Sequence, residues 1–221
     1  MDNSYDFQMQ TNRGAPTHTF RIARQCDVAQ ASAMPCGIKN PLWMGIPTRL
    51  LNLRMAADLA MTTLEALSGV SNQVIAKTEN QQSVPRLETV ERMAYALGVS
   101  PTWFAFGHDG DEPFSERIRR SPLQIPKDPR PGAPVPCPES YRAMPARLQL
   151  ARQKAGLSLR GLAKAAGLSG PGVQKIETGA SVPTIDNVEA IAKALGVSPG
   201  WLAFGIGRGP DGKKAKARAV A

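Results

Sequence analysis

The stretch Arg147–Gly205, RLQLARQKAGLSLRGLAKAAGLSGPGVQKIETGASVPTIDNVEAIAKALGVSPGWLAFG, occurs twice in this chain. Residues 49–107 align with it without a gap at an offset of 98 positions, and the run LGVSP lies near the end of both copies. Similarity over this length at a fixed offset indicates one supersecondary unit present twice. The fold of the chain therefore follows from the fold of one copy.

The second copy has the pattern of five short helices. Met144-Pro145 suits a helix start, because proline is tolerated at the first helical position. Ser158 and Ser169 are good N-caps, and glycines at 156, 167 and 179 suit left-handed helix ends. Apolar residues recur three and four positions apart along the predicted helices, as at Ile185, Val188, Ile191, Ala192 and Leu195. The sequence predicts an all-α unit of about 60 residues, close to the lower limit for an independent core.

The second and third predicted helices are joined by a tight turn. Gly167 supplies the bend, and Ala163 faces the turn, where little room exists. Leu162, Val173 and Ile176 are placed to hold the two helices together. Two helices joined in this way form the helix-turn-helix pattern, whose second helix enters the DNA major groove by its N-terminal residues.

The second copy resembles the Cro/C1 repressor (Xre) family of helix-turn-helix DNA-binding domains. The resemblance implies a five-helix, lambda-repressor-like fold, operator DNA as partner, dimer formation and control of transcription. It also implies that an arginine of the first helix pairs with the glutamate that ends the recognition helix, here Arg152 with Glu177 and Arg54 with Glu79. It is carried by Arg147, Leu148, Arg152, Gly156, Ser158, Leu162, Ala163, Gly167, Leu168, Ser169, Ile176, Glu177, Gly179, Pro183 and residues 191–197.

The first copy departs from this pattern at three positions. A buried carboxylate without a partner costs several kcal/mol, so we expect either that Glu65 reaches solvent or that the two helices pack differently here. Asn80 stands beside the missing helix-ending glycine and is a residue that can take the left-handed conformation. Glu65, Thr78 and Gln81 take the places of Ala163, Ile176 and Gly179.

The chain is predicted to consist of two helix-turn-helix domains with connecting segments. Eight prolines make the linker semi-extended, with a reach of about 100 Å, whereas major-groove faces one helical turn apart need about 34 Å. The linker therefore permits both domains to bind one duplex without requiring it. The predicted boundaries are a mostly irregular, flexible N-terminal arm at 1–46, a degenerate domain at 47–107, the Pro-rich linker at 108–144, a second domain at 145–205 and a basic tail at 206–221, expected to be disordered when free.

Basic charge is concentrated towards the C-terminus. Residues 145–205 carry seven basic and three acidic residues, and residues 206–221 carry five and one, so together they hold +8 of the net charge of +9. This distribution is typical of a protein with a polyanionic partner. The sequence has no run of 18 or more apolar residues, so no membrane span is predicted. The N-terminus lacks the basic and then apolar pattern of a signal region. We expect a cytoplasmic protein, of bacterial or phage origin by the resemblance, associated with the nucleoid when bound to DNA.

The resemblance places the DNA-reading positions at the start of the third helix of each copy. In the first copy these are Ser71, Asn72 and Gln73, with Lys77 one turn later; amides pair with adenine, and lysine reaches guanine or phosphate. In the second copy the positions that begin at Asn72 are occupied by Gly170-Pro171-Gly172, which offer no side-chain donor. The candidates of the second copy are therefore Arg160, Lys164, Ser169, Gln174 and Lys175.

Several alternatives follow from this division. Both copies could bind double-stranded DNA, the second copy could bind alone, or the first could serve in homodimerisation or in binding a protein partner. Glu65 and Gly170-Pro171-Gly172 favour a protein-interaction module as the rival function. Trp103 and Trp201, with Phe106 and Phe204, form either a core plug or a dimer contact. We expect no enzymatic activity, cofactor or metal, since the sequence has no nucleophile with a base, no ligand cluster and no phosphate loop.

Overall fold

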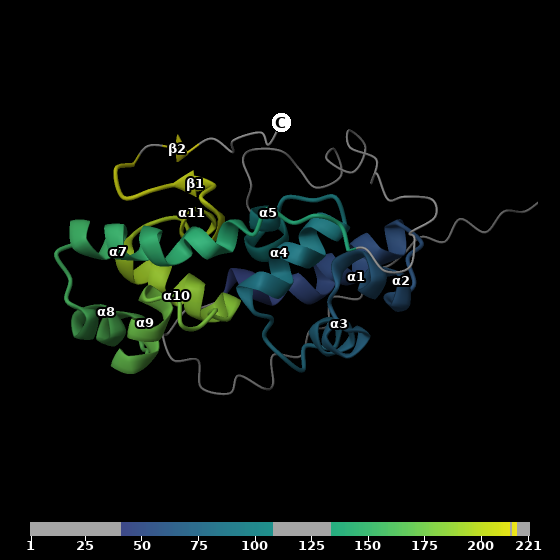
Figure 1. Ribbon diagram of the computed structural model, residues 1–221, viewed down its shortest axis with the longest axis horizontal. Coiled ribbons are helices and arrows are strands. Elements are labelled where there is room, and N and C mark those ends of the chain that lie inside the picture. The colour runs from purple at the N-terminus through teal and green to yellow at the C-terminus, as the bar shows by residue number, and fades with distance from the viewer. Residues whose placement is uncertain (1–40, 108–133, 213, 216–221) are drawn as a thin grey trace, which may run out of the picture. The chain divides into compact units, whose positions relative to one another are not determined.

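The computed structural model describes residues 41–107, 134–212 and 214–215 (Figure 1). Each copy of the repeated sequence folds into five α-helices, which confirms the predicted all-α class, and both copies fall within one compact unit of the chain. We call the two sets repeat 1 and repeat 2. Repeat 1 contains α1 (Ile46–Ala56), α2 (Met61–Ser68), α3 (Asn72–Glu79), α4 (Leu87–Ala96) and α5 (Pro101–Phe106), and repeat 2 contains α7 (Met144–Lys154), α8 (Leu159–Ala166), α9 (Gly170–Glu177), α10 (Ile185–Leu195) and α11 (Pro199–Phe204).

Helix ends in repeat 2 form as the sequence predicts. The hydroxyl oxygens of Ser158 and Ser169 accept hydrogen bonds from the amides of Gly161 at 3.0 Å and Gly172 at 3.2 Å. Gly167, between α8 and α9, has a φ of 68°, which glycine adopts without the steric cost that a Cβ atom would add.

The end of α3 in repeat 1 differs from the prediction. Gln81 adopts the left-handed conformation, with a φ of 58°, whereas Asn80 has a φ of −85°. Asn80 therefore does not take the left-handed position that its residue type permits. Gln81 aligns with Gly179, which has a φ of 73°, so the chain keeps the same turn even though a glutamine now carries the strain, a cost of about 1–2 kcal/mol.

The helix pair of repeat 1 survives its two unusual residues. Glu65 is partly exposed, so its carboxylate reaches water, whereas the aligned Ala163 is buried. Thr78 is fully buried, but its hydroxyl donates to the carbonyl oxygen of Val74 at 2.8 Å. Because both polar groups are satisfied, α2 and α3 keep the bounds of α8 and α9 at the offset of 98 residues.

The predicted arginine–glutamate pairs are present in both repeats. Arg54 donates from Nε and Nη2 to the two carboxylate oxygens of Glu79, at 2.7 and 3.0 Å. Arg152 does the same to Glu177, at 2.8 and 2.6 Å. The hydrogen bond to Glu79 raises the pKa of Arg54, and the bond to Glu177 raises that of Arg152. Each pair ties the first helix to the end of the third, which is a structural role.

The two repeats pack against each other. Each backbone contact that a residue of one repeat makes here is matched by a contact of the equivalent residue in the other repeat. Arg86 and Thr184, which are equivalent positions, form an antiparallel bridge. On either side of it, the amide of Leu87 donates to Pro183 at 3.0 Å and the amide of Ile185 donates to Pro85 at 3.1 Å. Helices α5 and α11 also contact each other. A contact in which equivalent residues exchange roles is the signature of a two-fold axis, here an approximate one within a single chain.

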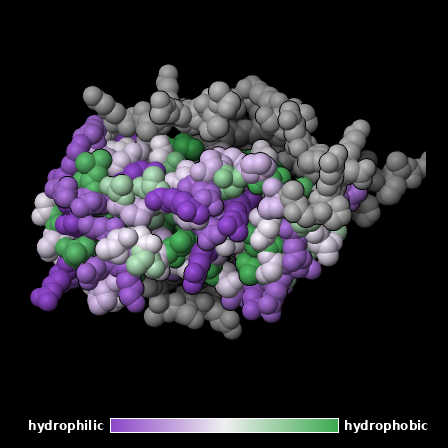
Figure 2. All heavy atoms as spheres, viewed as in Figure 1, coloured by the Kyte–Doolittle hydropathy of each residue, from purple (hydrophilic) through white to green (hydrophobic). Residues whose placement is uncertain are grey.

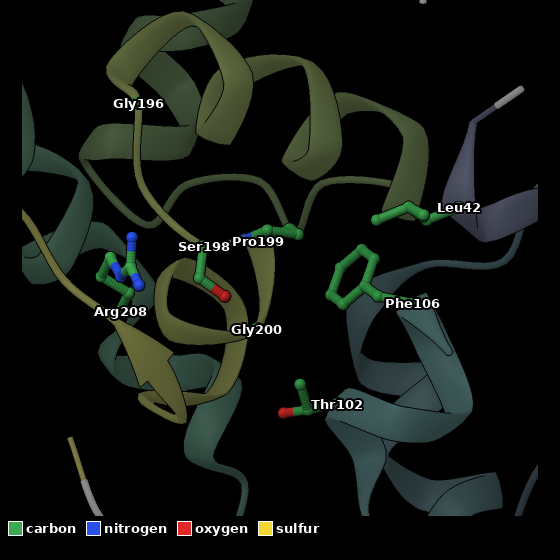
Figure 3. Close-up of a pocket in the computed structure, with 8 residues that line it drawn as sticks. All are labelled: Leu42, Thr102, Phe106, Gly196, Ser198, Pro199, Gly200 and Arg208. Carbon is green, nitrogen blue, oxygen red and sulfur yellow. The ribbon is translucent and has the colours of Figure 1, made fainter. Parts of the chain in front are cut away.

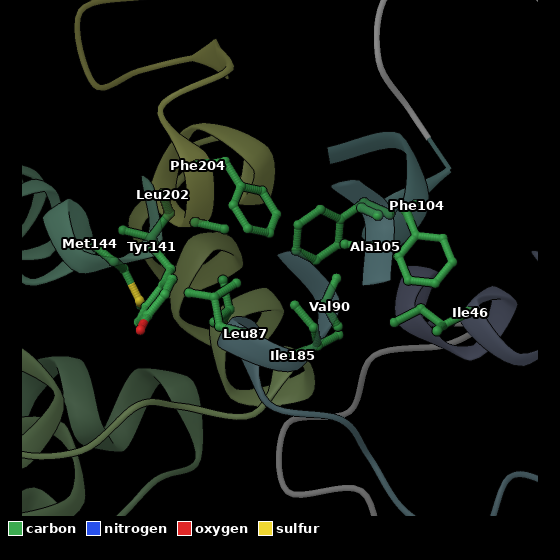
Figure 4. Packing of buried hydrophobic residues seen from close by; sticks show 14 of the residues in the cluster. Ile46, Leu87, Val90, Phe104, Ala105, Tyr141, Met144, Ile185, Leu202 and Phe204 are labelled. Carbon is green, nitrogen blue, oxygen red and sulfur yellow. The ribbon is translucent and has the colours of Figure 1, made fainter. Parts of the chain in front are cut away.

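Hydrophobic residues of both repeats form one continuous core (Figure 4). Val90 and Leu87 of α4 lie with Ile185 of α10 near its centre, and Phe204 of α11 faces them from the other side. All four aromatic residues of the paired motifs, Trp103, Phe106, Trp201 and Phe204, are buried, which confirms their role in the core. The alternative interpretation was a contact between two chains of a dimer. The helices that carry these residues, α5 and α11, instead contact each other within one chain.

Short segments outside the predicted domains belong to the folded unit. A 3-10 helix, η1 (Leu42–Gly45), lies in the predicted arm, and another, η2 (Ser140–Ala143), lies in the predicted linker. The amide of Val135 donates to the carbonyl oxygen of Leu67 at 2.7 Å, so this part of the linker packs on repeat 1. The predicted irregular arm before residue 41 and the linker from 108 to 133 lie outside the described residues.

The start of the basic tail is folded, which corrects the expectation of disorder for these residues. Strand β1 (Gly207–Arg208) pairs antiparallel with β2 (Lys214–Ala215). The amide of Ser198 donates to the carbonyl oxygen of Arg208 at 2.9 Å, and Lys154 forms an ion pair with Asp211. The tail is held because it finds backbone partners at the start of α11, a long-range contact that composition does not predict.

Candidate nucleic-acid interface

Helix α3 has a buried face that packs on repeat 1 and an exposed face with polar side chains. Ile75 and Thr78 are buried against the repeat, whereas Ser71, Gln73 and Lys77 are exposed. Gln73 and Lys77 are four residues apart and therefore lie on the same side of the helix, one turn apart. A glutamine amide and a lysine ammonium at this spacing can contact adjacent base edges or a base and a phosphate.

Asn72 is less accessible than the other candidates of repeat 1. Its side chain is only partly exposed, and its Oδ1 is buried without a hydrogen-bond partner among the described residues. An amide whose oxygen is turned inward cannot make the two-bond contact to adenine in this conformation. Gln73 and Lys77 are therefore the better placed reading residues of α3.

Helices α8 and α9 of repeat 2 present a basic surface. Arg160 and Lys164 lie one turn apart on α8, and Lys175 lies on α9 next to Gln174; all four are exposed. In the part of the chain that the structure describes, none of the three cations forms an ion pair, so their charge is available to a partner. Three unpaired cations on two adjoining helices suit contact with phosphates.

The N-terminal end of α9 has no side chain that could donate to a base, but its helix cap is formed. Ser169 is exposed, and its hydroxyl caps the helix through the amide of Gly172. A Cβ added at Gly170 would meet nothing within 4 Å, so the space in front of this end is open. Because the first turn of a helix carries backbone N–H groups and partial positive charge, an open end of this kind suits a phosphate oxygen better than a base edge.

Sequence reasoning missed the residues that hold the repeats together. Glu91 and Glu189 are almost fully buried, and each accepts hydrogen bonds from the 3-10 helix of the other repeat. The sequence did show a glutamate at equivalent positions of both repeats, on the inner face of a predicted helix. Since a buried glutamate needs a partner, this pattern could have predicted a contact for each side chain.

A pocket of about 370 Å³ lies where the repeats meet, away from the reading helices (Figure 3). Thr102 is buried, and its hydroxyl has no hydrogen-bond partner among the described residues. Phe106 and Leu42 form the apolar side of the pocket in this view. The lining residues are Leu42, Thr102, Phe106, Gly196, Ser198, Pro199, Gly200 and Arg208.

The rest of the described surface carries few large apolar groups. Met44, Leu51, Met55 and Leu150 are the exposed large hydrophobic residues of the described ranges. Figure 2 shows a face on which hydrophilic residues predominate and hydrophobic ones form small separate patches. Within the described part, no helix has the length and apolar character to cross a membrane, and no group of three or more His, Cys, Asp or Glu side chains is placed to hold a metal ion.

Comparison with known proteins agrees with this architecture. The helix-turn-helix family matches the chain at residues 50–104 and again at residues 148–202, at the offset seen in the sequence and in the helix bounds. No curated protein and no solved structure matches the chain. The chain therefore belongs to the helix-turn-helix family of DNA-binding proteins and carries its Cro/C1-type domain as two tandem copies.

Proposed function

We propose that the chain is a sequence-specific, repressor-like regulator of transcription that binds operator DNA through both repeats. The observation that carries this proposal is the state of the two third helices. Both α3 and α9 are locked to a first helix by a bidentate Arg–Glu pair, and both leave polar or basic residues exposed and without an ion pair among the described residues. Reading of the major groove requires a helix that the rest of the domain holds rigidly and that exposes polar side chains to the DNA.

The repeats divide the work of binding. Repeat 1 supplies Gln73 and Lys77, which discriminate between bases, although its predicted domain has five basic and five acidic residues. Repeat 2 supplies the basic surface of Arg160, Lys164 and Lys175 and an open helix end, which hold the phosphate backbone. Sequence preference then comes mainly from repeat 1, and salt-dependent affinity mainly from repeat 2.

The approximate two-fold relation between the repeats supports one further feature of the operator. Reading helices related by a two-fold axis match half-sites in inverted orientation. Because the residues at the start of α3 and α9 differ, the two half-sites are unequal in sequence. Regulation would follow from occupancy of promoter DNA and would require no chemistry on the DNA.

The experiment that tests the proposal is selection of full-length protein on a pool of random duplexes, followed by binding measurements at two salt concentrations. We expect one motif with two unequal inverted half-sites to be enriched. If no motif is enriched and binding disappears with salt, the protein holds DNA only through charge, and the proposed sequence-specific function is wrong.

The rival function is a module that binds another protein through its helices. The inward-turned Asn72 oxygen and the bare start of α9 favour it, because both reduce the capacity to read bases. Substitution of Arg160 and Lys175 by alanine distinguishes the two functions. Loss of duplex binding in that variant supports the regulator, whereas an unchanged weak affinity for DNA supports the protein-binding module.

A further inference from the structure

Helices α5 and α11 approach closely at Thr102 and Gly200, which are equivalent positions of the two repeats. A Cβ atom added to Gly200 would lie 2.2 Å from Cγ2 of Thr102 and 3.2 Å from its Oγ1. Both residues line the pocket between the repeats, in which Thr102 points towards the segment that carries Gly200 (Figure 3). The methyl group of Thr102 therefore occupies the space that the missing side chain of Gly200 leaves.

The other contacts across the repeats do not depend on which repeat is which. The bridge at Arg86 and Thr184 is made by backbone groups on both sides. Glu91 and Glu189 are the same residue type, and each accepts two backbone amides from the other side, to which the Ser140 hydroxyl adds one bond at Glu91. These contacts would form equally well if repeat 1 met a second repeat 1. Arg86 and Thr184 are also unequal but meet through backbone groups, whereas at Thr102 and Gly200 the presence or absence of a side chain decides the contact.

From this difference we infer that pairing is heterotypic: the α4–α5 face of repeat 1 accepts the α10–α11 face of repeat 2 and rejects a second copy of itself. A pair of two repeats 1 would place Thr102 against Thr102, where even one added carbon lies far inside van der Waals contact. Relief would require the two helices to move apart, because the atoms involved belong to two short β-branched side chains, which are stiff at χ1.

Pairing of two repeats 2 is disfavoured for the opposite reason. Gly200 against Gly200 would leave unfilled the space that the Thr102 methyl group now occupies, and an unfilled core space is destabilising. Partners within one chain also meet at a high effective concentration. The surface that could join two chains is thus buried in the contact between the repeats of one chain. We therefore expect the protein to be a monomer. Pairing of the repeats does not depend on whether the protein reads operator DNA.

The test uses full-length protein with Gly200→Ala. The amides of Leu87 and Ile185 donate across the repeats, so their hydrogen exchange reports pairing directly. The amide of Leu168 donates to Ala163 within repeat 2 at 2.8 Å and reports whether that repeat is folded. We expect exchange at Leu87 and Ile185 to become at least about tenfold faster, with Leu168 still protected. Unchanged protection at Leu87 and Ile185 would overturn the inference.

A second variant separates the pairing contact from local strain, because the added carbon would also lie 2.9 Å from the carbonyl oxygen of Ile206. Thr102→Ala/Gly200→Ala removes the Thr102 methyl group but keeps the strain at Ile206. We expect the double variant to regain most of the lost protection. If it does not, the effect arises within repeat 2 and the inference is wrong. Gly170→Ala, at a position with open space around it, is the matched control.

The oligomeric state gives an independent check. Sedimentation equilibrium of the wild-type protein, without DNA, should report the mass of one chain across the accessible concentration range. A dimer at micromolar concentration would contradict an internally satisfied pairing surface. Neither measurement involves DNA, so a failure here is distinct from a failure of the proposed regulatory function.

Discussion

Glu91 and Glu189 occupy equivalent positions in the two repeats, and each binds the other repeat. Glu91 accepts the amides of Ser140 at 2.8 Å and Tyr141 at 3.1 Å, and also the Ser140 hydroxyl. Glu189 accepts the amides of Leu42 at 2.9 Å and Trp43 at 3.3 Å. Each carboxylate thus satisfies backbone donors that precede the first helix of the opposite repeat, so pairing and the entry into each repeat are coupled.

Glu91→Ala is therefore expected to be strongly destabilising. It leaves two amides and a hydroxyl without an acceptor in the interface, at a cost of about 2–4 kcal/mol in the free energy of unfolding. Urea denaturation measures the change. The control is Glu88→Ala on the same helix, whose partly exposed ion pair with Arg92 is worth about 0.5 kcal/mol. Equal losses for the two variants would show that Glu91 has no special role in pairing.

The bidentate pair of Arg152 and Glu177 is expected to support the position of α9. Arg152→Ala leaves the Glu177 side chain, which is only 11% exposed, without its partner, a loss of about 3 kcal/mol. The double variant Arg152→Ala/Glu177→Ala should be less destabilised than the sum of the two single variants, by about 1–2 kcal/mol in a double-mutant cycle. Strict additivity in thermal unfolding would mean that the pair is not coupled.

Thr102→Val tests the buried hydroxyl, which has no hydrogen-bond partner among the residues that the structure describes. Valine keeps a methyl group facing Gly200 and removes the unsatisfied oxygen, so we expect the free energy of unfolding to rise by up to about 1 kcal/mol. Thr62→Val, at an exposed position of α2, should change stability by less than about 0.5 kcal/mol. Clear destabilisation by Thr102→Val would indicate that the hydroxyl is bound after all.

Lys175→Ala tests the phosphate-binding role of repeat 2. We expect binding to weaken by a similar factor on every duplex sequence, and the slope of log affinity against log salt to fall by about one. Fluorescence anisotropy on matched and scrambled duplexes measures both quantities. A loss confined to the matched duplex would instead make Lys175 a base-reading residue. Lys193→Ala, on α10 outside the reading helices, is the control.

Gln73→Ala tests base reading by repeat 1. Loss of a bidentate amide contact costs about 1–3 kcal/mol on the preferred sequence, with little effect on scrambled DNA. The selected motif should lose its preference at one A·T pair, which repeated selection from random duplexes would reveal. An unchanged motif would assign sequence choice to other residues. Gln82→Ala, an exposed glutamine beyond the end of α3, serves for comparison.

Local sequence determined the helices and their limits. The ungapped offset predicted two copies of one five-helix unit, and residues such as Ser158, Ser169 and Gly167 marked helix ends because their effects act over three or four residues. The Arg54–Glu79 and Arg152–Glu177 pairs came from the family resemblance and are present. The reading residues named from the sequence are on exposed positions except Asn72, and their contacts with DNA remain predictions.

Only the tertiary structure decided how the two repeats meet. The exchange of Glu91 and Glu189, the bridge of Arg86 with Thr184 and the fit of Thr102 against Gly200 join residues between 49 and 147 positions apart. No periodicity or capping pattern encodes such pairs, because their energy depends on two surfaces fitting in space rather than on neighbours in the chain. Gln81 shows the same limit on a smaller scale: the packed turn imposed the left-handed conformation on the residue at that position, against its intrinsic preference.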